Sequence, residues 1–400
     1  MTDPTGPLAG IRVLDLTNVL AGPFACHQLA HLGAEVVKVE VPGRGDLARN
    51  LGADPELSAR GMGISFLAQN AGKSSLTLNL KHPRGREALM RLVGTADVLV
   101  ENFRPGVMAR LGLGPEVLRA ANPRLIYCAI SGYGQGGPWA GRPAYDQIVQ
   151  GASGVMSVTG DADSAPLRVG YPLADTVGGL TAAMAICAAL QARPRGCVID
   201  VSMLEAVLAT MGWVVSNHLV GGIEPAAQGN ENPTSAPSGA FQCADGLLNI
   251  AANRDEQWTS LARHLGRADL LARPDYATRE DRKANRLRLK AELETVLTTR
   301  PAEDWAVELN AIGVPAGAVM TVPEILAHPQ VASRDFLARY EGVAGVGRGI
   351  DLMRIGAMID GRRPAVDAPP PELGAQSDAI LRGLGYTADE IDEMRAEGAT

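Results

Sequence analysis

The sequence predicts an α/β protein in which an open, mostly parallel, Rossmann-like sheet is joined to a smaller α+β domain. Short apolar segments of strand type alternate with segments of helical spacing through the first half of the chain, as in a sheet wrapped by helices. A stretch rich in Gly, Pro, Ser and Asn follows at residues 221–240, and the pattern of apolar and charged residues changes after it. The chain has 400 residues, enough for two or three domains with buried cores.

The first elements form a strand–helix–strand unit. Residues 11–16 (IRVLDL) are short and apolar, as expected of a buried strand. After a Gly-Pro break, residues 24–32 have helical apolar spacing that ends at Gly33, and residues 35–40 (EVVKVE) form a second strand. Such a unit implies a parallel pair of strands with a right-handed crossover.

The same alternation continues along the chain. Residues 83–93 predict a helix because Pro83 stands at its start and Gly94 lies just beyond its end. In chain order, the other elements expected in this half are a strand at 97–101, a helix at 115–121, a strand at 125–131, helices at 145–153 and 176–192, a strand at 197–201 and a helix at 204–220. Each new strand extends the expected parallel sheet.

Three parts are expected from these patterns. Residues 1–220 form the large Rossmann-like domain, and residues 221–240 form a linker or an active-site loop. Residues 241–330 form the small α+β domain, because a hairpin pattern with an Ala-Asp-Gly turn precedes charged amphipathic helices.

Composition excludes several classes of function. Lys and Arg number 37 and Asp and Glu 44, so the net charge of −7 is unlike that of proteins that bind nucleic acids or anionic membranes. The five cysteines are widely spaced and contain no CxxC motif, which fits a reducing compartment. No signal peptide precedes the first strand, and the longest apolar stretch, residues 178–190, is shorter than the roughly 20 residues of a membrane span. We expect a cytoplasmic protein.

Sequence motifs for metals and nucleoside triphosphates are absent. The chain contains no HExxH, no GxxxxGK[ST], no DxDxDG and no GxSxG. Among the six histidines only His27 and His31 share the i, i+4 spacing of one helix face, and no third ligand accompanies them. We therefore expect neither a metal nor a nucleoside triphosphate as cofactor.

A glycine-rich loop at residues 132–137 (GYGQGG) follows a predicted strand. The segment after it contains two prolines and cannot form the helix that a dinucleotide fingerprint requires. Ligands nevertheless bind at the carboxyl ends of strands in open α/β sheets. We expect this loop, with Gly134 and Gly136, to let a substrate approach the backbone.

Asp175 is the most notable carboxylate, because it stands just before a long and nearly uncharged apolar helix. Two interpretations remain open from the residues alone. Asp175 could cap the helix by accepting hydrogen bonds from free backbone amides. It could equally be a weakly hydrated nucleophile held in an apolar, amide-rich site.

Ordered matches along nearly the whole chain point to one family. They are 8–16 (LAGIRVLDL), Ala21-Gly22-Pro23, 32–40 (LGAEVVKVE), 70–81 (NAGKSSLTLNLK), 97–106 (DVLVENFRPG), 122–126 (NPRLI), 131–138 (SGYGQGGP), 142–146 (RPAYD), Asp175 and 200–207 (DVSMLEAV). In these segments the chain resembles the class III CoA-transferases, which include formyl-CoA transferase and the carnitine and bile-acid CoA-transferases.

The resemblance implies a chemistry for Asp175. In this family the matching aspartate attacks an acyl-CoA thioester, forms an acyl-aspartyl anhydride and then an aspartyl-CoA thioester, and an acceptor carboxylate reverses the sequence. Such an exchange is covalent catalysis and needs no metal or ATP. Coenzyme A and its acyl thioesters are then the expected substrates, and a small dicarboxylate such as succinate could be one of the acids, with Arg168 and the loop at 229–235 near its distal carboxylate.

The resemblance also implies binding residues and an assembly. The residues that match the CoA-binding segments of the family are Val19, Leu20, Ala21, Leu78, Asn79, Leu80, Lys81, Asn102, Phe103, Arg104, Arg110, Arg142, Pro143, Ala144, Tyr145 and, for the adenine pocket, Met203. Gly229 and Asn230 match the position of a loop at the small-acid site. The family forms interlocked homodimers of ring-shaped subunits, in which residues 331–400 would complete the large domain.

Departures from the family bear on specificity. Leu20 stands where formyl-CoA transferase has Gln, its glycine-run loop is replaced at 229–233, and Val41 replaces an arginine that contacts CoA. Oxalate and formate are therefore doubtful acids for this chain. A 2-methylacyl-CoA racemase of the same fold is an alternative, although no histidine lies between His82 and His218 to serve as its second acid/base group. A non-catalytic acyl-CoA-binding protein is another.

Overall fold

The computed structural model describes residues 6–400, which form two compact units. Unit 1 consists of the described residues through Val155, Arg168–Gly221 and Ala332–Thr400, and unit 2 of Met156–Leu167 and Gly222–Val331. The segment Met156–Leu167 thus interrupts unit 1 in the sequence. Each unit has its own hydrophobic core, as expected of an independent domain.

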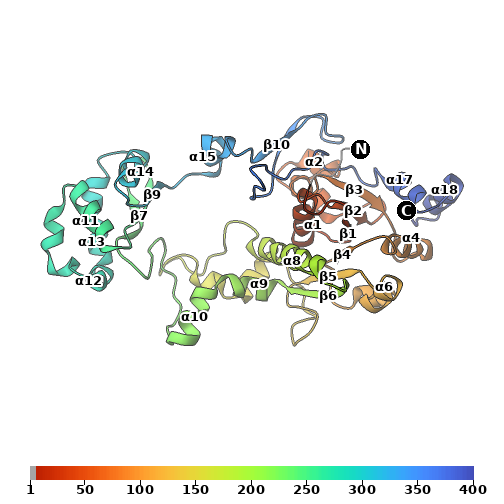
Figure 1. Cartoon of the computed structure of the whole chain (residues 1–400), viewed down its shortest axis with the longest axis horizontal. Coiled ribbons are helices and arrows are strands. Elements are labelled where there is room, and N and C mark those ends of the chain that lie inside the picture. The colour runs from red at the N-terminus through yellow and green to blue at the C-terminus, as the bar shows by residue number, and fades with distance from the viewer. Residues whose placement is uncertain (1–5) are drawn as a thin grey trace. The chain divides into compact units, whose positions relative to one another are not determined.

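Unit 1 is built on a six-stranded parallel sheet in the order β3-β2-β1-β4-β5-β6 (Figure 1). Its strands are β1 (Arg12–Asp15), β2 (Glu35–Glu40), β3 (Lys73–Thr77), β4 (Val98–Glu101), β5 (Ile126–Ser131) and β6 (Cys197–Ser202). All five pairings are parallel, so the predicted mixed α/β fold with a mostly parallel sheet is confirmed. The sequence did not predict β3.

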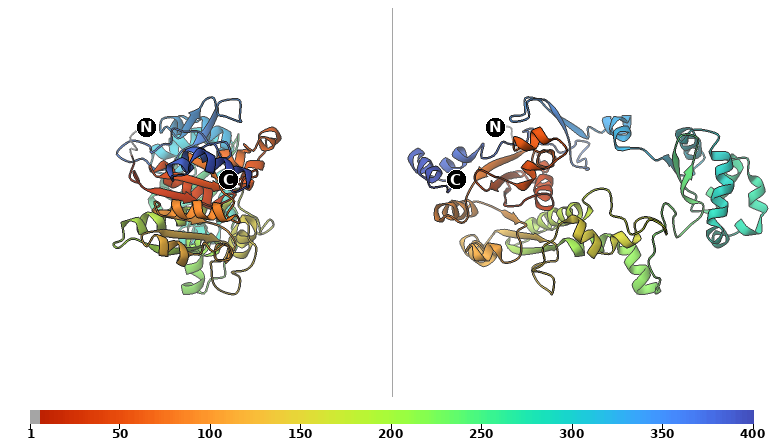
Figure 2. Two further views of the ribbon diagram at one scale, coloured as in Figure 1. Left: turned by 90° about the vertical axis from the view of Figure 1, so that its right-hand side faces the viewer. Right: turned by 180° about the vertical axis from the view of Figure 1, so that it is seen from behind.

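Helices cover the sheet of unit 1 (Figure 2). They are α1 (Ala21–His31), η1 (Leu47–Asn50), α2 (Pro55–Ala59), α3 (Ile64–Leu67), α4 (Pro83–Val93), α5 (Val107–Arg110), α6 (Pro115–Ala121), α7 (Asp146–Ala152), α8 (Leu173–Gln191), α9 (Met203–Thr210), α10 (Gly212–Gly221), α17 (Ser377–Gly383) and α18 (Ala388–Ala396). The single helix expected at 204–220 is wrong, because α9 and α10 are bent by 74° at Met211, next to Gly212.

The C-terminal segment of unit 1 lies against the edge strand β3. The backbone N–H of Gln376 donates to the Ser75 carbonyl at 3.0 Å, and Ala399 accepts from the backbone N–H of Asn79 at 2.9 Å. A small antiparallel pair, β10 (Leu337–Tyr340) and β11 (Ile350–Met353), precedes this segment. Residues more than 300 positions apart therefore share one sheet edge.

Unit 2 is an α+β structure around the antiparallel sheet β7-β8-β9. Its elements are β7 (Ser238–Gln242), β8 (Leu247–Ala251), α11 (Asp255–His264), η3 (Ala268–Ala272), η4 (Pro274–Tyr276), α12 (Arg279–Ala284), α13 (Arg286–Leu297), α14 (Ala302–Ala311), β9 (Ala316–Ala318), α15 (Val322–Ala327) and α16 (Pro329–Ala332), with η2 (Val155–Val158) at the boundary of the two units. Trp258, Tyr276 and Trp305 are buried in its core.

Helix α8 is 19 residues long and has a mean hydropathy of 1.6, so length and composition alone would allow it to cross a membrane. The expectation that the longest apolar stretch is too short to span is therefore wrong. Its small residues Gly178, Gly179 and Ala182 are buried, and α8 packs closely against α1. A Cβ on Gly179 would lie 2.5 Å from the Ala21 carbonyl oxygen, so only glycine allows this approach.

His27 and His31 are both buried on α1, with ring centroids 4.4 Å apart. No group of three or more His, Cys, Asp and Glu side chains that could hold a metal ion occurs in residues 6–400. Nε2 of His27 has no hydrogen-bond partner among these residues. Burial lowers the pKa of the His27 ring. Burial and the nearby Arg354 guanidinium together lower the pKa of His31 to about 4.

We expect this pair to make the fold sensitive to acid. The unfolded chain takes up protons near pH 6.5, whereas folded His31 does so only near pH 4, so stability is full above pH 6.5 and falls as the pH drops toward 4. For His31 alone the loss over this range amounts to about 3 kcal/mol. Urea unfolding of His31→Leu at pH 7.5 and 4.5 should show a smaller pH effect than the wild type. A pH effect in His31→Leu as large as that of the wild type would contradict the assignment.

Candidate active site

The centre of the unit 1 sheet is a topological switch point. Strands β1 and β4 are neighbours, but the connection from β1 leads toward β3 and the connection from β4 leads toward β6. Where connections diverge in this way, the loops leave a crevice at the carboxyl ends of the two strands. Two cavities of unit 1 lie there.

The first, called here the Asp175 cavity, has a volume of about 330 Å³. It is lined by residues that follow strands β1, β4, β5 and β6 and by the first turn of α8. These residues are Asn18, Val19, Leu20, Ala21, Leu47, Asn102, Phe103, Arg104, Ile130, Ser131, Gly132, Pro143, Ala144, Tyr145, Asp175 and Met203. Apolar side chains predominate, so a carboxylate in this cavity is only weakly hydrated.

Asp175 lies in the first turn of α8 and does not cap it. The N-cap residue is Pro172, and the first-turn amides are bonded instead by Asp146 of α7. Oδ1 of Asp146 accepts from the backbone N–H of Ala174 at 2.8 Å and from that of Asp175 at 3.4 Å. The capping interpretation of Asp175 is therefore wrong. Within residues 6–400 no hydrogen bond to the Asp175 carboxylate is found, which leaves it free to react.

The electrostatic surroundings of Asp175 favour its neutral form. Burial and the negative charge of Asp146 raise the pKa of Asp175 to about 7. Asp146 is itself held by Nε2 of Gln150 at 2.7 Å and by the guanidinium of Arg168 at 3.5 Å. Asp175 is thus partly ionised at neutral pH, and its carboxylate is basic and poorly solvated, which are the properties of a good oxygen nucleophile.

The second cavity, called here the Lys81 cavity, has a volume of about 600 Å³. Its lining follows strands β1, β2 and β3 together with part of α5: Leu16, Thr17, Asn18, Val39, Glu40, Val41, Pro42, Arg44, Leu78, Asn79, Leu80, Lys81, Phe103, Val107, Leu111 and Gly398. Asn18 and Phe103 line both cavities, so the two adjoin. A long ligand could therefore lie across the switch point with its ends in different cavities.

Cations at these cavities are unpaired. Arg44, Lys81 and Arg104 form no ion pair with any carboxylate in residues 6–400, whereas the buried Lys38 and Lys73 are both paired. An exposed cation beside a concave site is available for a phosphate. Arg44 was missed by the sequence analysis, although its place in a turn just after β2, near the lost arginine at Val41, could have indicated it.

The structure brings most of the predicted binding residues to these cavities. The Asp175 cavity is lined by Val19, Leu20, Ala21, Asn102, Phe103, Arg104, Pro143, Ala144 and Tyr145, and the Lys81 cavity by Leu78, Asn79, Leu80 and Lys81. Met203 lines the Asp175 cavity and not the Lys81 cavity, and its predicted place in an adenine pocket stays a prediction. It packs against α8, where a Cβ on Gly178 would lie 2.8 Å from its Cγ.

Two predicted cations line neither cavity. Arg110 is exposed at the end of α5, whose first residue, Val107, lines the Lys81 cavity. Arg142 stacks on Trp139 with its guanidinium 4.7 Å from the ring centroid. Both remain close in sequence to lining residues.

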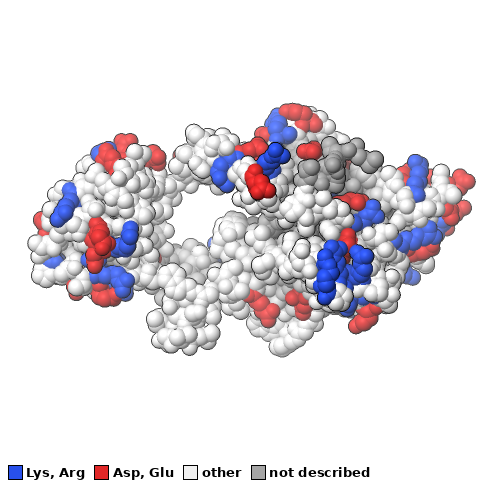
Figure 3. Space-filling model, in the orientation of Figure 1, with Lys and Arg blue, Asp and Glu red and all other residues white. Residues whose placement is uncertain are grey.

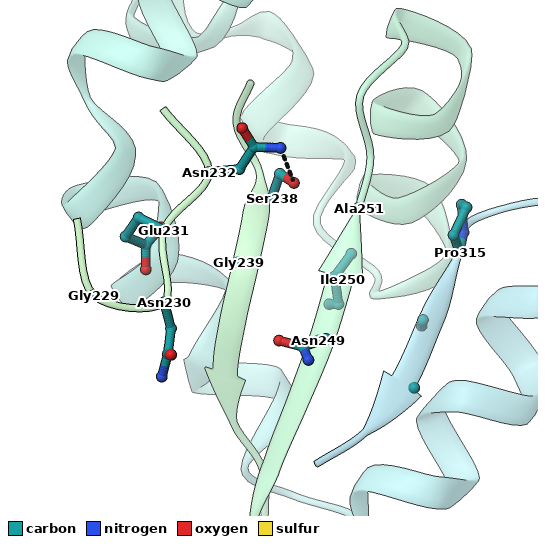
Figure 4. Close-up of a pocket in the computed structure, with 12 residues that line it drawn as sticks. Gly229, Asn230, Glu231, Asn232, Ser238, Gly239, Asn249, Ile250, Ala251 and Pro315 are labelled. Atoms are coloured by element: carbon teal, nitrogen blue, oxygen red, sulfur yellow. Dashed lines mark hydrogen bonds between the residues drawn. The ribbon is translucent and has the colours of Figure 1, made fainter. Parts of the chain in front are cut away.

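The predicted substrate-binding glycines have different surroundings. Gly134 and Gly136 flank Gln135, whose backbone N–H donates to the Asp200 carboxylate at 2.9 Å, but of this loop only Gly132 lines the Asp175 cavity. Gly229 and Asn230 belong to unit 2 and line its own cavity of about 510 Å³ (Figure 4). There Nδ2 of Asn232 donates to Oγ of Ser238 at 3.3 Å, and the exposed side chain of Asn249 lies on the neighbouring strand β8.

Comparisons with known proteins agree on one family. The sequence pattern of "CoA-transferase family III" matches residues 8–377. The chain is 42% identical over 353 residues to acetyl-CoA:oxalate CoA-transferase of Acetobacter aceti, covering 87% of this chain and 90% of the relative. It is 37% identical over 384 residues to succinate–glutarate CoA-transferase of Agrobacterium fabrum, covering 94% and 96%. A CAIB/BAIF family protein from Brucella suis matches in structure with a TM-score of 0.83 at 35% identity, covering 95% of this chain and 99% of that one.

Proposed function

This chain belongs to CoA-transferase family III, and we propose that it moves CoA from an acyl-CoA to a carboxylic acid through covalent intermediates on Asp175. It is an enzyme of the class III CoA-transferase type. The observation that carries the covalent proposal is the Asp175 carboxylate itself, which faces an apolar cavity at the switch point without a hydrogen bond from residues 6–400.

The proposed reaction begins with two steps on the donor. An oxygen of Asp175 attacks the thioester carbonyl, the C–S bond breaks, and the CoA thiolate leaves with the electron pair. The thiolate then attacks the Asp175 carbonyl carbon of the resulting anhydride. This step releases the donor acid as a carboxylate and leaves CoA on Asp175 as a thioester.

The acceptor then reverses these steps. Its carboxylate attacks the aspartyl thioester and expels the thiolate, and the thiolate attacks the acceptor carbonyl of the new anhydride. The products are acceptor acyl-CoA and free Asp175, and no proton or water is consumed. The apolar lining, including Leu20, Leu47, Ile130 and Phe103, supports this sequence because it limits hydrolysis of the anhydride.

We assign the nucleotide part of CoA to the Lys81 cavity and its thioester end to the Asp175 cavity. Arg44 and Lys81 would then face the phosphates, with Arg104 near the junction of the two cavities. In this assignment residues 1–220 and 331–400 form the CoA-binding domain, and residues 241–330 form the small domain. Gly229 and Asn230 remain proposed contacts of the acid.

A dicarboxylate is the proposed second substrate. The relatives named above act on oxalate, succinate or glutarate. Arg168 remains the proposed partner of the distal carboxylate, and its guanidinium lies 3.5 Å from Asp146, the residue that holds the start of α8. A 2-methylacyl-CoA racemase is not favoured, since no histidine lines the Asp175 cavity within residues 6–400. The test is a screen of mono- and dicarboxylic acids against acetyl-CoA and succinyl-CoA, read by mass spectrometry. Absence of every new acyl-CoA would contradict the proposed function.

An interlocked homodimer is proposed as the assembly. Helix α10 has no buried residue, and Trp213, Leu219 and Val220 on it are more than half exposed. Figure 3 shows the surface over α10 free of charged side chains. Large exposed apolar patches of this kind mark protein interfaces. Sedimentation at nanomolar concentration should give a dimer, and a stable folded monomer would contradict it.

The five cysteines form no disulfide, which agrees with the proposed cytoplasmic location.

The pH dependence of transfer should report the state of Asp175. Because only the carboxylate is nucleophilic, the rate should rise with pH through about 7. Asp146→Asn keeps an oxygen for the α8 amides but removes the neighbouring negative charge, so the pKa of Asp175 should fall and the inflection should move to lower pH. A pH–rate profile of both proteins checks this, and an unmoved inflection would contradict the role of Asp146.

Arg104→Ala should weaken binding of the nucleotide part of CoA. The Michaelis constant for acyl-CoA should rise by the equivalent of about 1.5–3 kcal/mol if a charged hydrogen bond to phosphate is lost. A pantetheine thioester lacks the nucleotide and should be hardly affected. Equal losses with both substrates would show that Arg104 does not contact the nucleotide end.

A further inference from the structure

The turn after β1 contains an unusual backbone conformation. Val19 has φ +68°, in the left-handed region that β-branched residues rarely adopt. Such a conformation persists only where the surrounding structure holds it in place. Val19 also lines the Asp175 cavity, between Asn18 and the start of α1.

One buried carboxylate holds this turn. The backbone N–H of Val19 donates to Oδ1 of Asp46 at 2.9 Å, and the same oxygen accepts from the backbone N–H of Ala48 at 2.9 Å as the cap of η1. Leu47 of η1 lines the Asp175 cavity as well. A single oxygen atom therefore fixes two separate parts of the cavity wall.

Asp46 is in turn held by its neighbours. It is 2% exposed, its Oδ2 lies 2.9 Å from Nζ of Lys38, and its backbone N–H donates to Glu40 at 3.0 Å. Nζ of Lys38 also donates to the Thr17 carbonyl at 2.9 Å, so the turn is attached at two points. Asp46 cannot shift without moving both cavity walls.

We propose that Asp46 is a positioning residue for CoA transfer, because its Oδ1 holds Val19 in the left-handed conformation and thereby shapes a wall of the cavity that contains the nucleophile. This inference rests on the proposed function. The Lys81 cavity, to which we assign the nucleotide, has its own cations, so misplacement of Val19 should affect the reacting end of acyl-CoA more than its binding. The expected signature is a lower kcat with little change in KM.

Two substitutions separate geometry from charge. Asp46→Asn keeps an oxygen for the Val19 and Ala48 amides, since Asn caps about as well as Asp, but places its NH2 group against Lys38 in place of a charged oxygen; it should lose stability and retain most of the kcat of the folded protein. Asp46→Glu keeps the charge but moves the oxygen by one methylene, and kcat should fall on the order of 100-fold with KM within about threefold. Rates are normalised to folded protein from melting curves. Low kcat in Asp46→Asn with full kcat in Asp46→Glu would overturn the proposal.

Val19→Gly tests whether Asp46 acts through Val19. Glycine adopts φ +68° without strain, so the loss caused by Asp46→Ala should be smaller in the Val19→Gly background than in the wild type. Asp54→Ala is the matched control, because Asp54 caps the neighbouring α2 without contacting the turn, and it should leave kcat unchanged. Equal losses in both backgrounds would overturn the proposal. If Asp46→Ala does not fold, the Asn and Glu variants decide alone, and a wild type without transfer activity would instead refute the proposed function.

Discussion

Asp175→Asn is expected to abolish CoA transfer, lowering kcat by on the order of 1,000-fold or more, while the protein stays folded. The amide is nearly isosteric with the carboxylate but is not a nucleophile toward a thioester. Asp146, and not Asp175, bonds the free amides of α8, so the substitution removes no cap from that helix. Initial rates with the best acid pair from the screen, together with melting curves, check this expectation.

The neighbouring Thr176→Ala provides the matched control. It removes a hydrogen bond to the Pro172 carbonyl at 2.9 Å in the same helical turn but leaves the carboxylate in place. We expect this control to keep near wild-type kcat. Transfer persisting at more than a few per cent in Asp175→Asn would refute the nucleophile, and equal losses in both variants would point to disruption of the α8 turn instead.

Asp15→Asn is expected to cause the largest loss of stability. Oδ2 of Asp15 lies 2.8 Å from Nζ of Lys73 and 3.9 Å from Nζ of Lys38, and all three side chains are fully buried. Both lysines hold the pKa of Asp15 well below its usual range despite burial. Removing the charge leaves the buried Lys73 ammonium without its counter-ion, whereas Lys38 keeps Asp46 at 2.9 Å, and one unpaired buried charge costs about 3–5 kcal/mol.

Chemical unfolding of Asp15→Asn and the wild type at neutral pH measures this loss. Asp54→Asn is the control, because Asp54 caps an exposed helix and Asn caps about equally well, so its change should stay within roughly 0.5 kcal/mol. A similarly small change for Asp15→Asn would contradict the prediction, because it would mean that water or another group balances the charge of the buried lysines.

The sheet was largely predictable because most of its strands are continuous apolar runs. Strands β1, β2, β4 and β5 coincide with predicted segments, as expected of parallel strands buried on both faces. The edge strand β6 also coincides with a predicted segment, although Val198 and Asp200 on it are exposed. Strand β3 (KSSLT) escaped prediction because Lys73 and Ser75 point into the buried ion cluster with Asp15 and Glu40. Because these side chains are polar, the buried strand shows no apolar run in the sequence.

The site was predictable only in part. The segments that match the family lie at the two cavities, but the residues that support them do not follow from local pattern. Asp146 reaches amides 28 and 29 positions away, and Asp46 reaches an amide 27 positions away. Such contacts depend on tertiary packing of α7 on α8 and of η1 on the β1 turn. The place of Met203 likewise follows from its packing against Gly178.

Intact mass spectrometry of the protein incubated with acyl-CoA and no acceptor acid tests the central claim most directly. The account predicts a covalent adduct of the mass of CoA, cleaved by hydroxylamine, located by peptide mapping at Asp175 and absent from Asp175→Asn. An adduct on another residue, or an equal adduct in Asp175→Asn, would contradict the assignment of Asp175 as the nucleophile.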